Sequence, residues 1–116
     1  MGTHTILTAI SIAAPFPQKL GASPFFAYNR GMDKLNELSA TEAAAPIAAG
    51  KLKSEALVEA CLQRTAQRED EVQAWAALDR DLALARARAC DREAPRTRLH
   101  GIPVGVKDVF DTADLP

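Results

Sequence analysis

One short segment near the end of the chain has the pattern of a β-strand. Residues 102–107 read Ile-Pro-Val-Gly-Val-Lys, so apolar residues recur at every second position, the period that places alternate side chains on opposite faces of a sheet. A strand that stands alone leaves amides and carbonyls unpaired along both edges. No other segment of the 116 residues predicts a clear strand. We therefore expect a truncated chain, whose strand belongs to a sheet with further strands beyond Pro116.

Gly105 and Lys107 fall on the same face of this predicted strand. Because glycine has no side chain, Lys107 is predicted to point to a bare face that another group can approach closely. Asp108 either orients Lys107 or caps the following turn, and the turn is favoured because aspartate readily hydrogen-bonds its own local backbone. His100 is interpreted as a loop or packing residue, and His4 indicates no function.

The first predicted helix begins at a capping box. Ser39 and Glu42 have the spacing that satisfies free amides at a helix start, so the helix should begin at Ala40. Gly50 is a candidate for the stop. Pro46 removes an amide donor and crowds the preceding turn, which predicts a kink or an early end.

Two further helices follow. Ser54 opens a helix to about Arg68, and a third helix is predicted from a cap at Asp79 or Asp81 to Glu93. The predicted buried face of the second helix consists of Leu57, Val58, Cys61, Leu62 and Thr65. In the third helix a narrow apolar seam is predicted at Leu78, Leu82, Ala85 and Ala89. The predicted solvated face of the second helix consists of Glu55, Glu59, Gln63 and Gln67. Residues 72–78 are consistent with a short strand or an extended connector.

Composition and charge exclude several classes of function. The net charge of −1 creates no field that would attract nucleic acid or anionic lipid, and the arginines of residues 86–98 are interpreted as a solvated surface because no aromatic residue is interleaved for base stacking. The longest apolar run, residues 6–14, is shorter than the ~20 residues that cross a bilayer. Cys61 and Cys90 lack the spacing of a metal site. We expect a cytoplasmic protein with reduced cysteines, no membrane span and no metal.

Residues 1–31 differ from the rest of the chain. Prolines and glycines interrupt them without a sustained period, so they are predicted to be an extension that is disordered. Alternatively, Met32 is the natural start and the first 31 residues come from a misplaced initiation codon. N-terminal sequencing of the natural product distinguishes the two.

At residues 101–108 the sequence resembles a known enzyme family. Gly-Ile-Pro-Val-Gly-Val-Lys-Asp, followed by Asp-Thr-Ala-Asp-Leu-Pro at residues 111–116, is similar to the first catalytic block of the amidase signature family, and the upstream helices resemble that family's N-terminal helices. The resemblance covers about residues 33–116. It implies an α/β fold with a mixed sheet covered by helices, of which this mainly helical chain supplies the leading helices and the first catalytic strand. Residues 32–116 would then be the truncated N-terminal part of an amidase domain.

The resemblance also implies a mechanism. In that family a serine attacks a carboxamide, a second serine with a cis peptide relays the proton, and a lysine accepts it, and the position that matches the lysine is Lys107. Both serines belong to a glycine- and serine-rich block that this sequence does not contain, so the chain is expected to be inactive alone. The implied substrate of the parent is a small-molecule amide, with no metal or organic cofactor, and a homodimer is one option for its assembly.

A lysine serves as a base only when it is neutral. A free lysine has a pKa near 10.4, so about one molecule in 2,500 is neutral at pH 7, a deficit of about 4.6 kcal/mol. Burial lowers a lysine pKa by up to ~3–5 units. A strand inside a covered sheet provides that burial.

Three alternatives stay open. The parent could be the amidase subunit of a tRNA-linked amidotransferase, with glutamine as its amide. The chain could instead be a small helical interaction module, which would melt cooperatively and stay monomeric, whereas an amidase fragment is expected to aggregate or bind dye. A pseudoenzyme fragment retained for assembly with a full-length amidase is the third.

Overall fold

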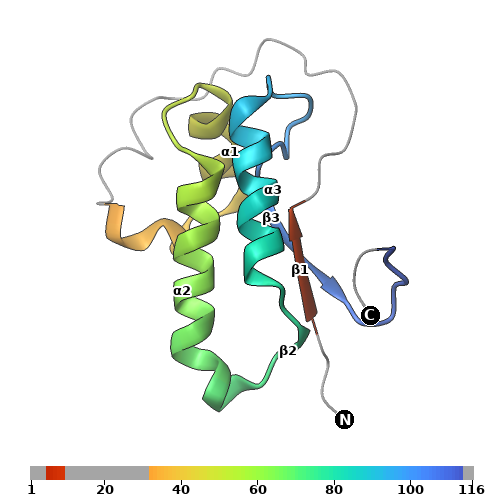
Figure 1. The fold of residues 1–116 in the computed structure, drawn as a ribbon. Helices are drawn as coiled ribbons and strands as arrows, with labels where there is room; N and C mark the ends of the chain where they lie inside the picture. The colour runs from red at the N-terminus through yellow and green to blue at the C-terminus, as the bar shows by residue number, and fades with distance from the viewer. Residues whose placement is uncertain (1–4, 10–31, 114–116) are drawn as a thin grey trace.

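The computed structural model describes residues 5–9 and 32–113. Its elements in chain order are strand β1 (Thr5–Ala9), the short helix η1 (Met32–Glu37), helices α1 (Ala40–Ala48) and α2 (Ser54–Val72), strand β2 (Trp75–Ala77), helix α3 (Arg80–Arg92) and strand β3 (Pro103–Lys107). Helices α2 and α3 run antiparallel beside each other, and the strands lie next to α3 (Figure 1). The described part is mainly helical, as predicted, and is compatible with a segment of an α/β fold.

The first helix begins where its capping box predicts. The Glu42 amide donates to Ser39 Oγ at 3.2 Å, and the Ser39 amide donates to Glu42 Oε2 at 2.9 Å. Helix α1 continues through Pro46 to Ala48 with Ala49 as its C-cap, so it ends at the predicted Gly50 stop, and the early end predicted from Pro46 was wrong. The Pro46 carbonyl accepts the amides of the following loop, and Gly50 adopts a positive φ of 69°.

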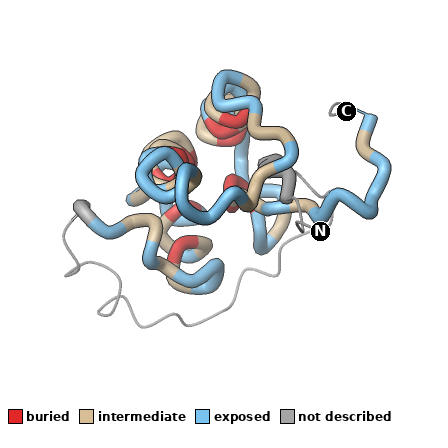
Figure 2. Tube along the Cα trace, turned by 90° about the horizontal axis from the view of Figure 1, so that it is seen from below, coloured by how far each residue is buried: buried red, intermediate tan, exposed pale blue. Residues whose placement is uncertain are grey.

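Helix α2 divides the core into two clusters. One consists of Ala43, Ile47, Leu57 and Ile102, and the other of Val58, Leu62, Ala83 and Ala87. The tube in Figure 2 shows the buried residues where the helices face one another. The predicted apolar face of α2 is confirmed, with Cys61 and Thr65 at its half-buried margin. Of the predicted solvated face, Glu55 and Glu59 are half-buried.

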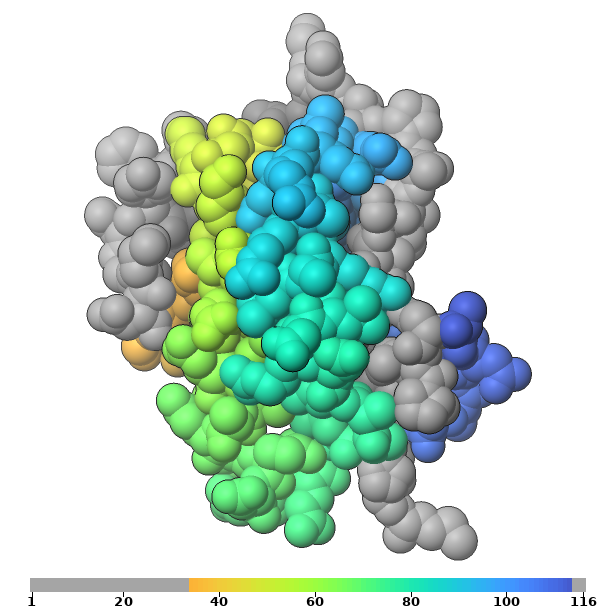
Figure 3. Space-filling model, in the orientation of Figure 1, coloured from red at the N-terminus to blue at the C-terminus, as the bar shows by residue number. Residues whose placement is uncertain are grey.

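The apolar seam predicted for the third helix is only partly correct, since Leu78 packs against the second cluster and Leu82 is half-buried but the later positions differ. Ala85 is exposed and Ala89 is half-buried, whereas Ala83 and Ala87 are fully buried against α2. Small side chains at this contact allow the two helices to approach closely, while the larger residues of α2 fill the space between them. In the space-filling view α2 and α3 form one continuous face of the molecule (Figure 3).

The expectation of a single strand was also wrong. Strands β2, β1 and β3 form a three-stranded sheet in that order, with β1 in the centre. Strand β1 is parallel to β2 and antiparallel to β3. Strand β2 lies within residues 72–78, for which the sequence was consistent with either a short strand or an extended connector. Strand β1 lies within residues 1–31, and the domain boundary at residue 32 stays a prediction.

Candidate active site

Lys107 is the last residue of β3 and is exposed. Gly105 lies two residues earlier on the same face and is exposed as well. Within the described part of the chain, the Lys107 ammonium forms no hydrogen bond or ion pair. The strand therefore presents this amine at the edge of the sheet, beside a position that has no side chain.

A turn follows Lys107 directly. The amide of Phe110 donates to the Lys107 carbonyl at 3.1 Å, and Asp108 lies within the turn. The Asp108 carboxylate is exposed and, among the residues that are described, bonds neither the local backbone nor Lys107. Val109 and Phe110 are 68% and 65% exposed, so the turn carries two large apolar side chains into solvent.

The start of β3 is fixed by a buried contact with the start of α2. Gly101 has a φ of +74°, and a Cβ there would lie 3.0 Å from the Ser54 Cβ. The fully buried Ser54 hydroxyl donates to the Gly101 carbonyl at 2.5 Å. Gly101 is thus required twice, once by its backbone conformation and once by the space that Ser54 occupies.

Asp91, at the end of α3, caps the start of α2. Its carboxylate accepts the amide of Ser54 at 2.7 Å and the amide of Glu55 at 3.1 Å. These amides belong to the first turn of α2, which has no intrahelical acceptor for them. The carboxylate also lies at the positive end of the helix dipole. A salt bridge also joins these two helices at the surface, with Arg88 Nε 2.6 Å from Glu55 Oε1.

His100 is a packing residue, as predicted. It is 4% exposed, and its Nε2 lies 2.9 Å from the Cys90 carbonyl. Burial raises the pKa of the Cys90 thiol, and it also raises that of Cys61. Both cysteines are unpaired, and a raised pKa keeps the reactive thiolate scarce at neutral pH.

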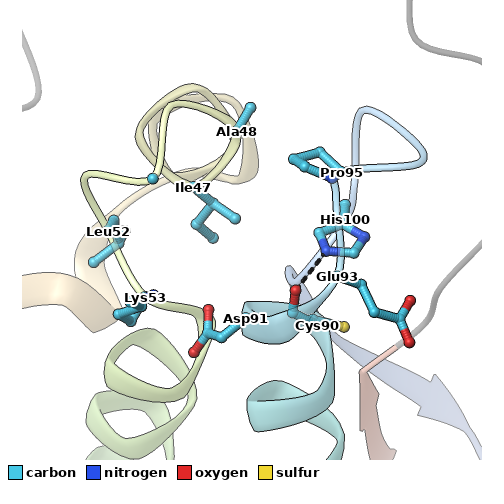
Figure 4. A pocket seen from close by; sticks show the side chains of 10 residues that line it. Ile47, Ala48, Leu52, Lys53, Cys90, Asp91, Glu93, Pro95 and His100 are labelled. Atoms are coloured by element: carbon cyan, nitrogen blue, oxygen red, sulfur yellow. Dashed lines mark hydrogen bonds between the residues drawn. The ribbon is translucent and has the colours of Figure 1, made fainter.

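A small pocket of about 120 Å³ opens beside this cluster. Figure 4 shows Ile47 and Lys53 on one side of it and His100 and Pro95 on the other, with Asp91 at its floor. Lys107 is not among its lining residues. The pocket therefore belongs to the packing between helices and is separate from the predicted catalytic position.

Among the described residues, no serine is hydrogen-bonded to Lys107. The serines of the described residues, Ser39 and Ser54, are bonded to helix-start and loop backbone groups instead. No cluster of three or more metal-ligating side chains occurs among the described residues. In the same part of the chain, no helix combines the length and apolar character that crossing a membrane requires.

Sequence reasoning identified Ser54 as a helix start but missed its link to Gly101 and its cap by Asp91, because both partners are far along the chain. His4 lies outside the described residues.

Comparison with known proteins places the chain in a family. The family model described as Amidase matches residues 56–116. The A subunit of the glutamyl-tRNA(Gln) amidotransferase of Desulfotalea psychrophila is 41% identical over 86 residues, which cover 72% of this chain and 18% of the relative. The corresponding A subunits of Chloroflexus aurantiacus and Streptomyces coelicolor are 40% and 38% identical over 89 residues, again 73% of this chain and 18% of each relative.

The chain thus spans less than a fifth of the length of these relatives. No solved structure matches it. The matched segment contains α2 from its third residue onward, all of β2, α3 and β3, and with them Asp91, Gly101 and Lys107, whereas Ser54 lies two residues before it. The chain belongs to the amidase family.

Proposed function

We propose that this chain is the N-terminal part of an amidase that acts on carboxamide C–N bonds, with Lys107 as the general base. The observation that carries the proposal is the position of Lys107, which ends β3 within the family-matched segment beside the bare Gly105. An amine there is reachable by a group contributed from outside the described residues. Its neutral form would take the proton of an attacking hydroxyl, which makes that oxygen a strong nucleophile.

We also propose that the 116-residue polypeptide is inactive by itself. It contains four serines, at positions 11, 23, 39 and 54, and no glycine- and serine-rich block. Lys107 is exposed, so the described part of the chain does not exclude water from its ammonium. The proposed mechanism needs a nucleophile and a desolvated base together, and the remainder of an amidase would supply both.

A chimera tests the role of Lys107. Residues 33–116 replace the matched segment of the Desulfotalea psychrophila relative, and release of ammonia from glutamine is measured. We expect an active chimera in which Lys107→Ala lowers kcat by at least ~10³-fold, since a general base is removed. Lys107→Arg should be equally inactive because a guanidinium does not lose its proton.

The matched control is Lys51→Ala, which changes an exposed lysine of the loop before α2. It should leave kcat within about twofold of the parent chimera. An active Lys107→Ala chimera contradicts the catalytic role. Ammonia release by the 116-residue chain alone contradicts its proposed inactivity.

A second proposal concerns the parent enzyme. The relatives compared above are named as A subunits of glutamyl-tRNA(Gln) amidotransferase, which favours an amidotransferase component working with partner subunits over an amidase of small aliphatic amides. We place the parent in the cytoplasm, without a cofactor. Reading the coding DNA beyond codon 116 would identify a glycine- and serine-rich continuation. The expressed parent should then release ammonia from glutamine, and activity on simple amides alone would contradict the proposal.

A further inference from the structure

Strand β1 lies outside the segment that matches the family model, yet it is the centre of the sheet. The match covers residues 56–116, which include β2 and β3 but not Thr5–Ala9. In the strand order β2-β1-β3, the two family strands are not paired with each other. Each of them contacts β1 instead (Figure 1).

The pairing between β1 and β3 extends over the whole of both strands. Thr5 lies opposite Lys107 and Ala9 lies opposite Pro103, with no register shift between them. On its other edge β1 runs parallel to β2, with Thr5 opposite Trp75 and one irregularity before Ile6. Successive main-chain groups of a central strand point to its two edges in turn, so all five residues of β1 pair with β3 while Thr5 and Ile6 also pair with β2.

The space between β2 and β3 has the properties of a site for an added strand. Without β1, the three residues of β2 and the five residues of β3 would have no strand partner among the described residues. Sheets of fewer than three strands are marginally stable in water. Helix α3 contacts β1, so the occupant of this space also lies against the helical layer.

We propose that β2 and β3 frame a strand-accepting site, which residues 5–9 occupy within the same chain. Its ligand class is an extended peptide that binds by main-chain hydrogen bonds, parallel to β2 and antiparallel to β3. Attachment to the same chain gives β1 a high effective concentration over any competing strand. The proposal is independent of the catalytic role of Lys107.

A proline in β1 tests the site in the full chain. Leu7→Pro removes one main-chain donor from the central strand, and hydrogen–deuterium exchange then reports on residues 103–107. We expect exchange at least about tenfold faster there, the effect of losing one hydrogen bond and the pairing around it. The control Leu7→Val keeps the amide and should keep the protection.

Adding the β1 sequence as a separate peptide shows whether Leu7→Pro only empties the site between β2 and β3 or disrupts the whole fold. A synthetic peptide with the sequence of residues 3–11, Thr-His-Thr-Ile-Leu-Thr-Ala-Ile-Ser, should restore protection to the Leu7→Pro chain and should not bind the unchanged chain. A peptide with proline at the position of Leu7 should restore nothing. If Leu7→Pro also exposes α2 and α3 to exchange, the peptide should restore these helices as well.

A cross-link tests the register in an otherwise unchanged chain. Leu7 lies opposite Gly105, and opposed strand residues are close enough for a disulfide. Leu7→Cys with Gly105→Cys should cross-link on mild oxidation, and Leu7→Cys with Val109→Cys should not. Unchanged exchange in the Leu7→Pro chain, failure of the peptide to restore protection, or absence of the 7–105 cross-link would each overturn the proposal.

Discussion

The hydroxyl of Ser54 donates a 2.5 Å hydrogen bond to the carbonyl oxygen of Gly101, and both residues are buried. The bond joins the first residue of α2 to the glycine that precedes β3, 47 positions along the chain. Because Gly101 lies two residues before β3, this contact helps to set where the strand that carries Lys107 begins.

Gly101→Ala should destabilise the chain far more than Gly50→Ala. Both glycines have a positive φ, but a Cβ at Gly101 would meet Ser54 at 3.0 Å, whereas nothing lies within 4 Å of one at Gly50. Left-handed backbone costs about 1–2 kcal/mol for alanine at either site, and overpacking adds about 1–3 kcal/mol at Gly101. Urea unfolding measures both variants. Equal losses would show that the contact with Ser54 is unimportant.

Asp91→Ala should lower the free energy of unfolding by about 2 kcal/mol, since it removes two charge-assisted bonds to the first turn of α2. The matched control is Asp70→Ala, which changes an exposed carboxylate near the other end of α2 and should stay within about 0.5 kcal/mol. Thermal and urea unfolding give both values. A loss for Asp70→Ala as large as that for Asp91→Ala would contradict the capping role.

Ala87→Leu should be poorly tolerated, and Ala85→Leu should be nearly neutral. Ala87 is fully buried between α2 and α3, while Ala85 is exposed on the same helix. The added volume at Ala87 separates the helices and costs about 1–3 kcal/mol, whereas both substitutions have similar helix propensity. Circular dichroism during urea titration measures the pair. A larger loss in the free energy of unfolding for Ala85→Leu than for Ala87→Leu would show that Ala85 faces the core, as the sequence predicted.

Stability should fall as the pH rises past the ordinary range of a thiol. Burial raises the pKa of Cys90 above its usual value of 9.0, although the Gly101 amide opposes the shift. The folded chain therefore holds this proton when the unfolded chain has lost it, so the contribution is complete below the unfolded pKa and is lost as pH rises through the folded pKa. Cys90→Ala should flatten the decline that begins near the unfolded pKa of 9.0 and continues as the pH rises through the folded pKa. If the free energy of unfolding fell equally with pH in the unchanged chain and in Cys90→Ala, the decline would not come from Cys90.

Much of the helical structure could be predicted because its determinants are local. The Ser39 and Glu42 box lies within one turn, Asp79 caps α3 by accepting the Leu82 amide three residues on, and Gly50 directly follows the C-cap of α1. The alternation around Val104 likewise indicated β3 from neighbouring residues alone. The motif at residues 101–108 indicated the amidase family for the same reason, since its residues are consecutive.

The sequence by itself determined where α1 and α2 begin, which strand carries Lys107 and which family the chain belongs to, whereas α2 runs to Val72, beyond the predicted end near Arg68. Only the tertiary structure decided that Asp91 caps α2, that Ala87 rather than Ala85 faces the core, and that β1 separates β2 from β3. Capping boxes and strand alternation involve only a few neighbouring residues, so they can be recognised in the sequence. Strand pairing and helix contacts depend on which distant segments meet, and main-chain hydrogen bonds leave no side-chain signature of their partner.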